Sequence, residues 1–168
     1  MPTCRTIKKK SLDDWPPFVT ISVIIPALNE ASTIAQTLEH LHALPQSGVT
    51  LEVFVVDGNS QDQTQILASN HARVLQSAPG RARQMNAGAN EATGDVLLFL
   101  HADTILPETG LQDIRDTISN PDIVGGRFDA RTDCDVGLLW LVCRLMSLRS
   151  RLTCIATGDQ AIFVRRGI

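Results

Sequence analysis

The chain has 168 residues and a formal net charge of −3; 43% of its residues are hydrophobic, 20% charged and 4% aromatic. This length suits one domain with a core of its own, and the composition excludes a disordered or collagen-like chain. The scarcity of aromatic side chains and the slightly negative charge argue against a nucleic-acid partner. We expect residues 1–20 to form an N-terminal tail and residues 21–168 to form the domain.

Strands and helices are predicted to alternate along the chain. Strands are expected over 21–25, 51–56, 73–75, 95–100, 123–128 and 160–165, and helices over 30–44, 61–70, 81–92, 107–119 and 136–152, with Asn29 as the N-cap of the first helix. Three of these strands, 21–25, 51–56 and 95–100, are long and mainly apolar, which is typical of parallel strands buried on both faces. The pattern therefore predicts a Rossmann-like α/β fold with a mainly parallel sheet flanked by helices.

Polar residues follow three of the strands, at the point where each strand ends. They are Pro26-Ala-Leu-Asn-Glu30, Asp57-Gly-Asn-Ser60 and His101-Ala-Asp-Thr104. Ligands of such sheets bind beyond the carboxyl ends of the strands, so these segments predict a binding site. The first turn has no glycine and the chain has no G-x-x-x-x-G-K-[ST] motif, which argues against dinucleotide binding and nucleoside triphosphate hydrolysis.

Two carboxylates at these strand ends are candidate ligand contacts. Asp57 could accept a hydrogen bond from a base or ribose, or it could stabilise the turn that follows its strand. Asp103 suits Mg²⁺ or Mn²⁺, which take few protein oxygens and complete their shell with phosphate and water. His101 could be a further metal ligand or a partly buried, hydrogen-bonded histidine.

Arg81 and Arg83 begin a predicted helix directly after Pro79-Gly80. Cationic side chains do not stabilise the positive end of a helix, so they indicate an anion at this point. The small residues Ala87-Gly88-Ala89 in the same helix would let it pack closely on the sheet.

Four ordered blocks resemble family 2 inverting glycosyltransferases of the GT-A fold, over roughly residues 20–166. The blocks are Pro26-x-x-Asn29-Glu30, Val56-Asp57-Gly58-x-Ser60-x-Asp62, Asn86-x-Gly88, and Ala92-x-Gly94-Asp95-x-x-x-Phe99-Leu100-x-x-Asp103. The stretches 80–88, 99–104 and 158–165 are similar to a small bacterial subgroup associated with radical-SAM and selenium-related domains.

The resemblance implies transfer of a sugar, with inversion, from a UDP- or GDP-linked donor to an unknown acceptor. It implies that Asp57 binds the base, that Arg81 or Arg83 contacts the base or diphosphate, and that Asp103, with His101 as a further candidate, holds Mg²⁺ or Mn²⁺. The remaining residues implied in nucleotide binding are Pro26, Ala27, Asn29 and Glu30.

The chain departs from the family pattern at two points. The first acid of the family's D-x-D motif is replaced, which leaves His101-Ala-Asp103. The family commonly places its catalytic base in a Glu-Asp pair on a later helix, and no such pair occurs before Ile168. Asp159 is then the candidate base, against a structural or acceptor-side role for it. A truncated, weakly active or inactive nucleotide-binding remnant is the alternative hypothesis.

Two further hypotheses concern a different reaction at Asp57 and a contact with a membrane. Phosphoryl transfer through Asp57 would need a second acid two residues later, where the chain has Asn59. Residues 138–151 are apolar with a basic edge, which fits either a core helix or a peripheral membrane contact beside a lipid-linked acceptor.

The four cysteines lack zinc-site spacing, and neither a signal peptide nor a long apolar run is seen. We therefore expect a cytoplasmic protein, with the inner membrane face as a second place of action.

Overall fold

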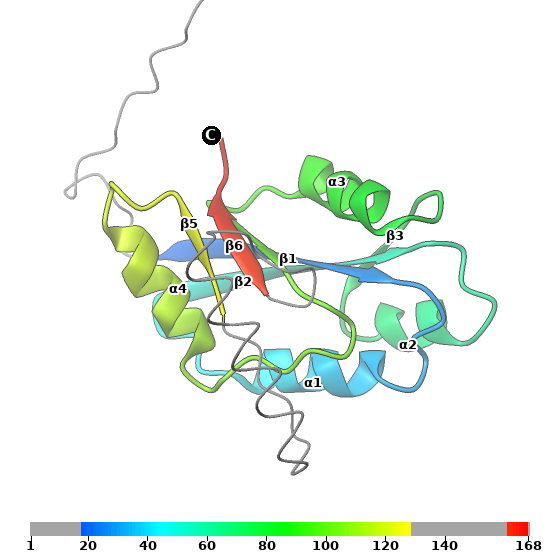
Figure 1. Cartoon of the computed structure of the whole chain (residues 1–168). Helices are drawn as coiled ribbons and strands as arrows, with labels where there is room; N and C mark the ends of the chain where they lie inside the picture. The colour runs from blue at the N-terminus through cyan, green and yellow to red at the C-terminus, as the bar shows by residue number, and fades with distance from the viewer. Residues whose placement is uncertain (1–17, 129–160, 168) are drawn as a thin grey trace, which may run out of the picture.

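The structure of the protein is a computed structural model that describes residues 18–128 and 161–167 (Figure 1). Within these residues, the strands form one six-stranded sheet in the order β3-β2-β1-β4-β6-β5. The strands are β1 (Val19–Ala27), β2 (Val49–Asp57), β3 (Arg73–Gln76), β4 (Val96–Phe99), β5 (Gly125–Arg127) and β6 (Ile162–Arg165). The helices are α1 (Ile34–Ala43), α2 (Thr64–Ser69), α3 (Arg81–Glu91) and α4 (Gly110–Ser119).

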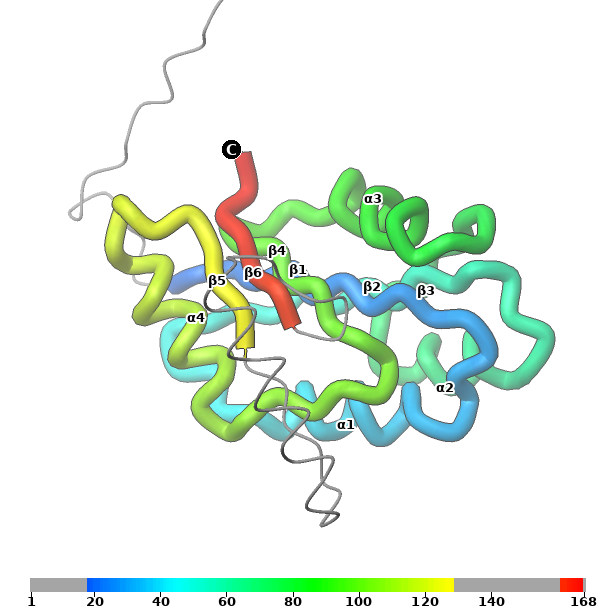
Figure 2. The backbone as a smooth tube through the Cα atoms, in the orientation of Figure 1, coloured from blue at the N-terminus to red at the C-terminus, as the bar shows by residue number. Residues whose placement is uncertain are grey.

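The sheet is mixed, with a parallel centre and an antiparallel edge. β1 pairs in parallel with both β2 and β4, and β2 pairs in parallel with β3. β6 runs antiparallel to β4 and carries β5 as the edge strand. The predicted α/β fold with a mainly parallel sheet is therefore confirmed, and the tube in Figure 2 shows how β4 and β6 extend the sheet beyond β1.

Helices cover both faces of the sheet, as Figure 1 shows. The larger core cluster joins α1, α2 and α4 to one face, through side chains such as Leu38, Ala68 and Ile114. The smaller cluster lies under α3 and includes Ile24 and Phe54. Alternate residues of β1 and β2 point to opposite faces, and over residues 23–25 and 53–56 both sets are apolar, which explains the continuous hydrophobic runs there.

Gly88 allows α3 to lie close to the sheet. A Cβ atom at this position would come within 2.5 Å of Ile24 Cγ2 and 3.0 Å of Val56 Cγ2. Both neighbours are fully buried strand residues, so neither has room to move aside. The close helix packing expected from the small residues of this segment is therefore seen at Gly88.

Gly88→Ala is expected to lower the free energy of unfolding by up to about 2 kcal/mol. Overpacking a tight core site costs about 1–3 kcal/mol. The better helix propensity of alanine returns about 1 kcal/mol. Urea unfolding would measure the difference, with Ala82→Gly, at an exposed position of the same helix, as the control for propensity alone. A stabilised Gly88→Ala variant would contradict this account of the packing.

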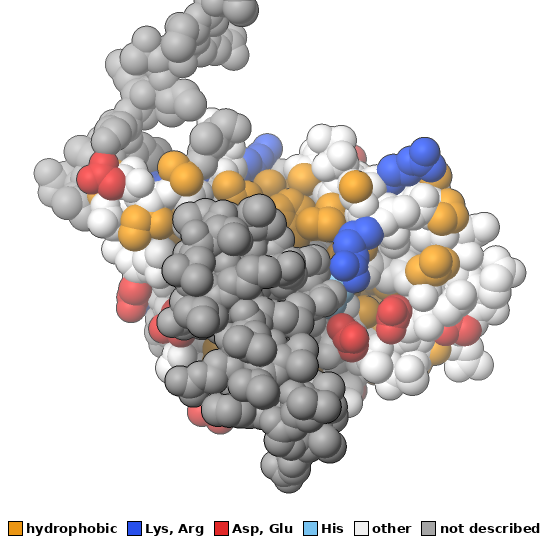
Figure 3. Space-filling view, in the orientation of Figure 1, with side chains coloured by type: hydrophobic (Ala, Val, Ile, Leu, Met, Phe, Trp, Pro, Cys, Tyr) orange, Lys and Arg blue, Asp and Glu red, His pale blue; other side chains and the backbone are white. Residues whose placement is uncertain are grey.

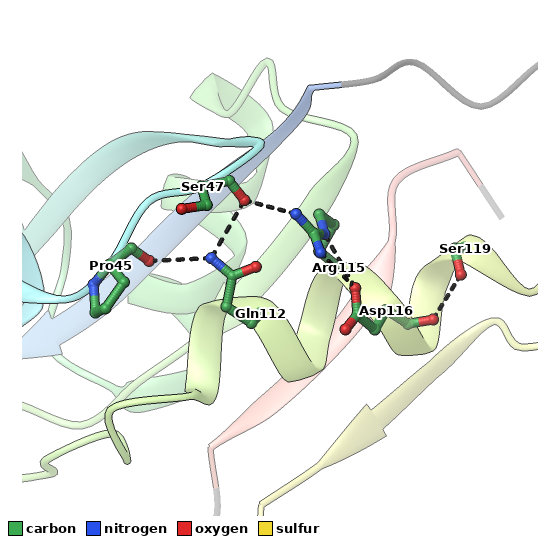
Figure 4. A network of polar contacts seen from close by, with 6 residues as sticks. All are labelled: Pro45, Ser47, Gln112, Arg115, Asp116 and Ser119. Carbon is green, nitrogen blue, oxygen red and sulfur yellow. Dashed lines mark hydrogen bonds and ion pairs between the residues drawn. The ribbon is translucent and has the colours of Figure 1, made fainter.

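α4 is attached to the loop that leads into β2, at the end of the sheet opposite the carboxyl ends of the parallel strands (Figure 4). Gln112 Nε2 donates to the carbonyl oxygen of Ser47 at 3.2 Å, and Arg115 Nη1 donates to the same oxygen at 2.7 Å. Arg115 is also paired with Asp116 at 2.8 Å. These contacts position α4 against the sheet from a side that carries none of the candidate site residues.

Glu52 joins β1, β2 and the turn before β4 at this same end. Its Oε2 atom accepts hydrogen bonds from Ser22 Oγ at 2.6 Å and from the amide of Thr93 at 2.8 Å. Ser22 Oγ in turn accepts from the amide of Gly94 at 2.9 Å. Partial burial alone would raise the pKa of Glu52, but these hydrogen bonds, with further ones from Thr93 Oγ1 and Gly94, outweigh it and lower the pKa.

Glu52→Gln is expected to cost about 1 kcal/mol of stability at pH 7, since hydrogen bonds to a charged group are lost. The folded pKa of Glu52 lies below its unfolded value. Its contribution is therefore complete above the unfolded pKa and is lost as the pH falls through the folded pKa. Thermal unfolding of both proteins should show the gap between them closing below about pH 4. A gap that is constant with pH would show that the charge of Glu52 contributes nothing.

The structure begins and ends several elements differently from the sequence prediction. β1 starts at Val19, two residues inside the expected tail. α1 starts at Ile34, not at residue 30, and its N-cap is Thr33. Asn29 was therefore wrong as the N-cap; it has a φ of 57° and lies in the loop.

Several predictions fall on residues outside the described part of the chain. They are the tail up to residue 17, the helical stretch 136–152, the membrane-contact segment 138–151, the four cysteines and Asp159. Among residues 18–128 and 161–167, no helix is long and apolar enough to cross a membrane.

Candidate nucleotide site at the carboxyl ends of the parallel strands

The parallel part of the sheet has a topological switch point at β1. β2 and β3 lie on one side of β1, and the chain then crosses over so that β4 lies on the other side. The carboxyl ends of β1, β2 and β4 meet at one edge, which brings together residues 26–30, 57–60 and 101–104. We call these three segments the rim. In open α/β sheets, such a switch point is where ligands bind.

A small pocket of about 60 Å³ lies at the switch point. It is lined by the ends of β1, β4 and β6 and by the first turns of α3, through Pro26, Arg81, Met85, Phe99, Leu100, His101 and Ile162. The molecular surface in Figure 3 shows basic and acidic side chains close together beside a hydrophobic area, on the side where the parallel strands of Figure 1 end. Of the rim residues, Pro26 and His101 therefore border this hollow, and residues 57–60 do not line it.

Hydrogen bonds join the loop after β1 to the loop after β2 and to the start of α2. Backbone amides of one loop donate to side chains of the other in both directions. The bonds are Asn29 N–H to Ser60 Oγ (2.9 Å), Glu30 N–H to Thr64 Oγ1 (2.8 Å), Ala31 N–H to Asp62 Oδ2 (3.1 Å) and Gln61 N–H to Asn29 Oδ1 (2.8 Å). The Asn29, Ser60 and Asp62 side chains of the sequence blocks thus fix the rim's shape.

Asp62 shows the electrostatic result of this arrangement. Hydrogen bonds from the Thr64 side chain, and then from the amides of Thr64 and Ala31, lower the pKa of the Asp62 carboxyl. The carboxylate is therefore charged at neutral pH and available as an acceptor for the loop after β1. Its role in the structure is to join the two loops.

Asp57 is fully buried, and its two carboxylate oxygens have different surroundings. Oδ2 accepts three hydrogen bonds, from the amides of Asn59 and Ser60 at 2.9 Å each and from Gln65 Nε2 at 2.8 Å. Oδ1 has no hydrogen-bond partner among the described residues. A buried polar atom without a partner is costly and requires an explanation, and a ligand donor is one.

The sequence left two roles for Asp57 open, and the contacts show that one does not exclude the other. Oδ2 holds the turn through Asn59 and Ser60, which is the structural role. Oδ1 remains available to accept a hydrogen bond from a ligand, which is the binding role. The hypothesis of phosphoryl transfer gains no second acid from the structure, because Asn59 occupies that position with a φ of 76° and an exposed side chain.

Gln84 is a rim-supporting residue that the sequence prediction missed. It is 4% exposed, and its Nε2 donates to the carbonyl oxygens of Ala27 and Val56 at 2.8 Å each. Its side chain also lies 3.0 Å from where a Cβ of Gly58 would be. Gln84 therefore holds the ends of β1 and β2 together beneath α3.

The other residues implied in nucleotide binding differ in how exposed they are. Ala27 is buried, whereas Pro26 and Glu30 are partly exposed at the rim. Arg83 is exposed on the first turn of α3. Arg81 lies next to His101, with Nη2 2.6 Å from His101 Nδ1. The fold thus brings all the implied residues of the described part to one edge of the sheet.

Asp103 is exposed on the loop after β4, one residue beyond the buried Ala102. Among residues 18–128 and 161–167, no group of three or more His, Cys, Asp or Glu side chains could hold a metal ion by itself. One exposed carboxylate fits Mg²⁺ or Mn²⁺ when a ligand's phosphate oxygens and water supply the rest of the shell. The residues present therefore fit a cation that arrives with a phosphorylated ligand.

The strand order, the switch point and the rim define a Rossmann-like α/β protein with the GT-A arrangement of strands and helices. The family model of glycosyl transferase family 2 matches residues 22–160, and the chain belongs to this family. The family resemblance of the sequence blocks is thereby confirmed.

Two relatives and one solved structure show how far the similarity extends. Glucosyl-3-phosphoglycerate synthase of Mycolicibacterium smegmatis is 28% identical over 160 residues, covering 81% of this chain and 52% of that protein. Glycosyltransferase AglE of Haloferax volcanii is 32% identical over 123 residues, covering 67% and 40%. The crystal structure of Mycobacterium tuberculosis glucosyl-3-phosphoglycerate synthase with Mn²⁺, UDP-glucose and phosphoglyceric acid is 25% identical, with a TM-score of 0.65, covering 88% and 57%. The chain spans about half the length of these proteins.

Proposed function

We propose that this chain binds the nucleoside diphosphate of a sugar donor at the rim and catalyses the transfer of that sugar to an acceptor. The observation that carries the proposal is the buried Oδ1 of Asp57 at the carboxyl end of β2, which has no hydrogen-bond partner in the part of the chain that the structure describes. Family membership supports the reaction class, and the rim supports the place. The mycobacterial relative solved with UDP-glucose supports the kind of donor.

The surroundings of Asp57 favour uracil as the base. Oδ2 is occupied by three donors, which leaves one carboxylate oxygen for a ligand. Uracil presents a single N–H donor at N3 between two carbonyl oxygens, which matches one acceptor. Guanine presents adjacent donors that are best matched by both oxygens of a carboxylate. Of the UDP- and GDP-linked donors expected from the sequence, we therefore propose the UDP-linked one.

The diphosphate is proposed to lie between Arg81 or Arg83 and Asp103. The two arginines begin α3, where the helix dipole also favours an anion. Asp103 would hold Mn²⁺ or Mg²⁺, which would neutralise charge on the leaving diphosphate. Arginine side chains and the helix end would stabilise the same charge from the other side.

The acceptor side of the reaction stays a prediction from the sequence. Inversion at the sugar carbon needs a base within hydrogen-bond reach of the acceptor hydroxyl, for which Asp159 is our candidate. The same prediction includes a lipid-linked acceptor and a peripheral contact through residues 138–151 at the inner membrane face. It also includes membership of the subgroup associated with radical-SAM domains. Asp159 and residues 138–151 lie outside the described part of the chain.

Calorimetry with the wild-type protein tests the proposal. UDP should bind, more tightly with Mn²⁺ than with a chelator, and GDP should bind more weakly than UDP. A folded protein that binds no nucleoside diphosphate would overturn the proposed function. UDP binding without release of UDP from UDP-glucose or another UDP-sugar, in the presence of candidate acceptors, would favour the alternative of a nucleotide-binding remnant.

A further inference from the structure

The contact between Arg81 and His101 joins two elements across the switch point. Arg81 is the first residue of α3, and His101 follows β4 by two residues. Both side chains line the pocket, and Arg81 Nη2 lies 2.6 Å from His101 Nδ1. His101 stands where the family pattern has the first acid of its D-x-D motif.

The chemistry of the two groups assigns the proton on the ring. A guanidinium group has donors and no acceptor, so Arg81 donates and His101 Nδ1 accepts. A histidine whose Nδ1 accepts a hydrogen bond carries its proton on Nε2. In this arrangement the Nδ1 lone pair is taken by Arg81 and Nε2 has no lone pair to offer. A metal ligand needs a free ring lone pair.

We propose that His101 is a positioning residue for Arg81 and is not a ligand of the cation. It holds the guanidinium at the entrance of the pocket and, as a neutral acceptor, adds no negative charge next to an incoming diphosphate. An aspartate at this position would have oriented Arg81 equally well but partly cancelled its charge. The inference rests on the proposed function, because it assumes that a nucleoside diphosphate is the ligand.

The proposal separates two kinds of binding. Nucleotide binding without metal should depend on His101, because Arg81 acts on the diphosphate directly. The affinity of the protein–UDP complex for Mn²⁺ should depend on Asp103 and not on His101. A ligand role would produce the opposite separation, so measuring both affinities distinguishes the two roles.

Two substitutions of matched chemistry test which ring nitrogen matters. The Oδ1 atom of His101→Asn can take the place of Nδ1 as the acceptor from Arg81, whereas the polar atoms of His101→Gln reach the place of Nε2. UDP affinity would be measured by calorimetry with a chelator present, and Mn²⁺ affinity of the UDP complex from the electron paramagnetic resonance signal of free Mn²⁺. Circular dichroism would show that each variant is folded.

We expect His101→Gln to weaken metal-free UDP binding about three- to tenfold, the range for releasing one ordered side chain. His101→Asn should stay within about twofold of wild type, and both variants should keep the Mn²⁺ affinity of the complex. In an Arg81→Ala background, His101→Gln should have no further effect on UDP binding.

Contrary results have separate meanings. A tenfold or greater loss of Mn²⁺ affinity in His101→Asn, with metal-free UDP binding unchanged, would make His101 a metal ligand and overturn the proposal. Equal UDP affinities of wild type, His101→Asn and His101→Gln would also overturn it, while the proposed function stands. If the wild-type protein binds no nucleoside diphosphate, the proposed function and this inference fail together.

Discussion

Asp57→Asn is expected to weaken the binding of UDP by about 30-fold or more and to reverse the preference between UDP and CDP. A hydrogen bond to a charged acceptor contributes about 2 kcal/mol, which is about 30-fold in affinity. The variant should stay folded, because its amide oxygen can accept the three bonds that Oδ2 now accepts. Its amide nitrogen then takes the place of Oδ1.

The reversal follows from the exchange of an acceptor for a donor. An amide N–H at this position repels the N3–H of uracil but can donate to the unprotonated N3 of cytosine. Calorimetry with UDP and with CDP gives the ratio of their affinities for the wild type and for the variant. Asp113→Asn, on the exposed face of α4, is the control and should leave both affinities unchanged. Unchanged UDP binding by a folded Asp57→Asn protein would refute a contact between Asp57 and the base.

Asp103→Ala is expected to remove the effect of metal on nucleotide binding. In the wild type, we expect Mn²⁺ to tighten UDP binding by about tenfold or more, and the variant should show less than about a twofold effect. Transfer from a UDP-sugar should fall by about 100-fold or more, because a cation on the leaving diphosphate contributes several kcal/mol to the transition state. Metal-free UDP binding should change little, because Arg81 is intact.

Calorimetry with Mn²⁺ and with a chelator measures this difference. Glu108→Gln is the matched control, since Glu108 is another exposed carboxylate in the segment between β4 and α4. It should keep the full metal effect. A metal effect in Asp103→Ala equal to that of wild type would show that the cation is held by residues other than Asp103.

The order of strands and helices in the described part could be predicted from the sequence because it depends on local patterns. The apolar runs that became β1 and β2 are buried on both faces, and no helical periodicity competes with them. Helix starts were predicted less well. Residues 30–33 looked helical, but α1 starts only at Ile34. In the structure the amides of Glu30 and Ala31 donate to the side chains of Thr64 and Asp62, which are distant in the sequence and which no local pattern reports.

The sequence by itself therefore determined the fold class, the edge of the sheet where polar residues gather, and the identity of Asp57 and Asp103 as its carboxylates. Only the tertiary structure decided which atom of Asp57 is available, that Gln84 supports the rim, and that Arg81 meets His101. Gln84 lies 57 positions from Ala27 in the chain, and Arg81 lies 20 from His101. Helix and strand periodicity report which face a residue occupies, whereas pairing between distant loops arises when the sheet closes and brings their ends together.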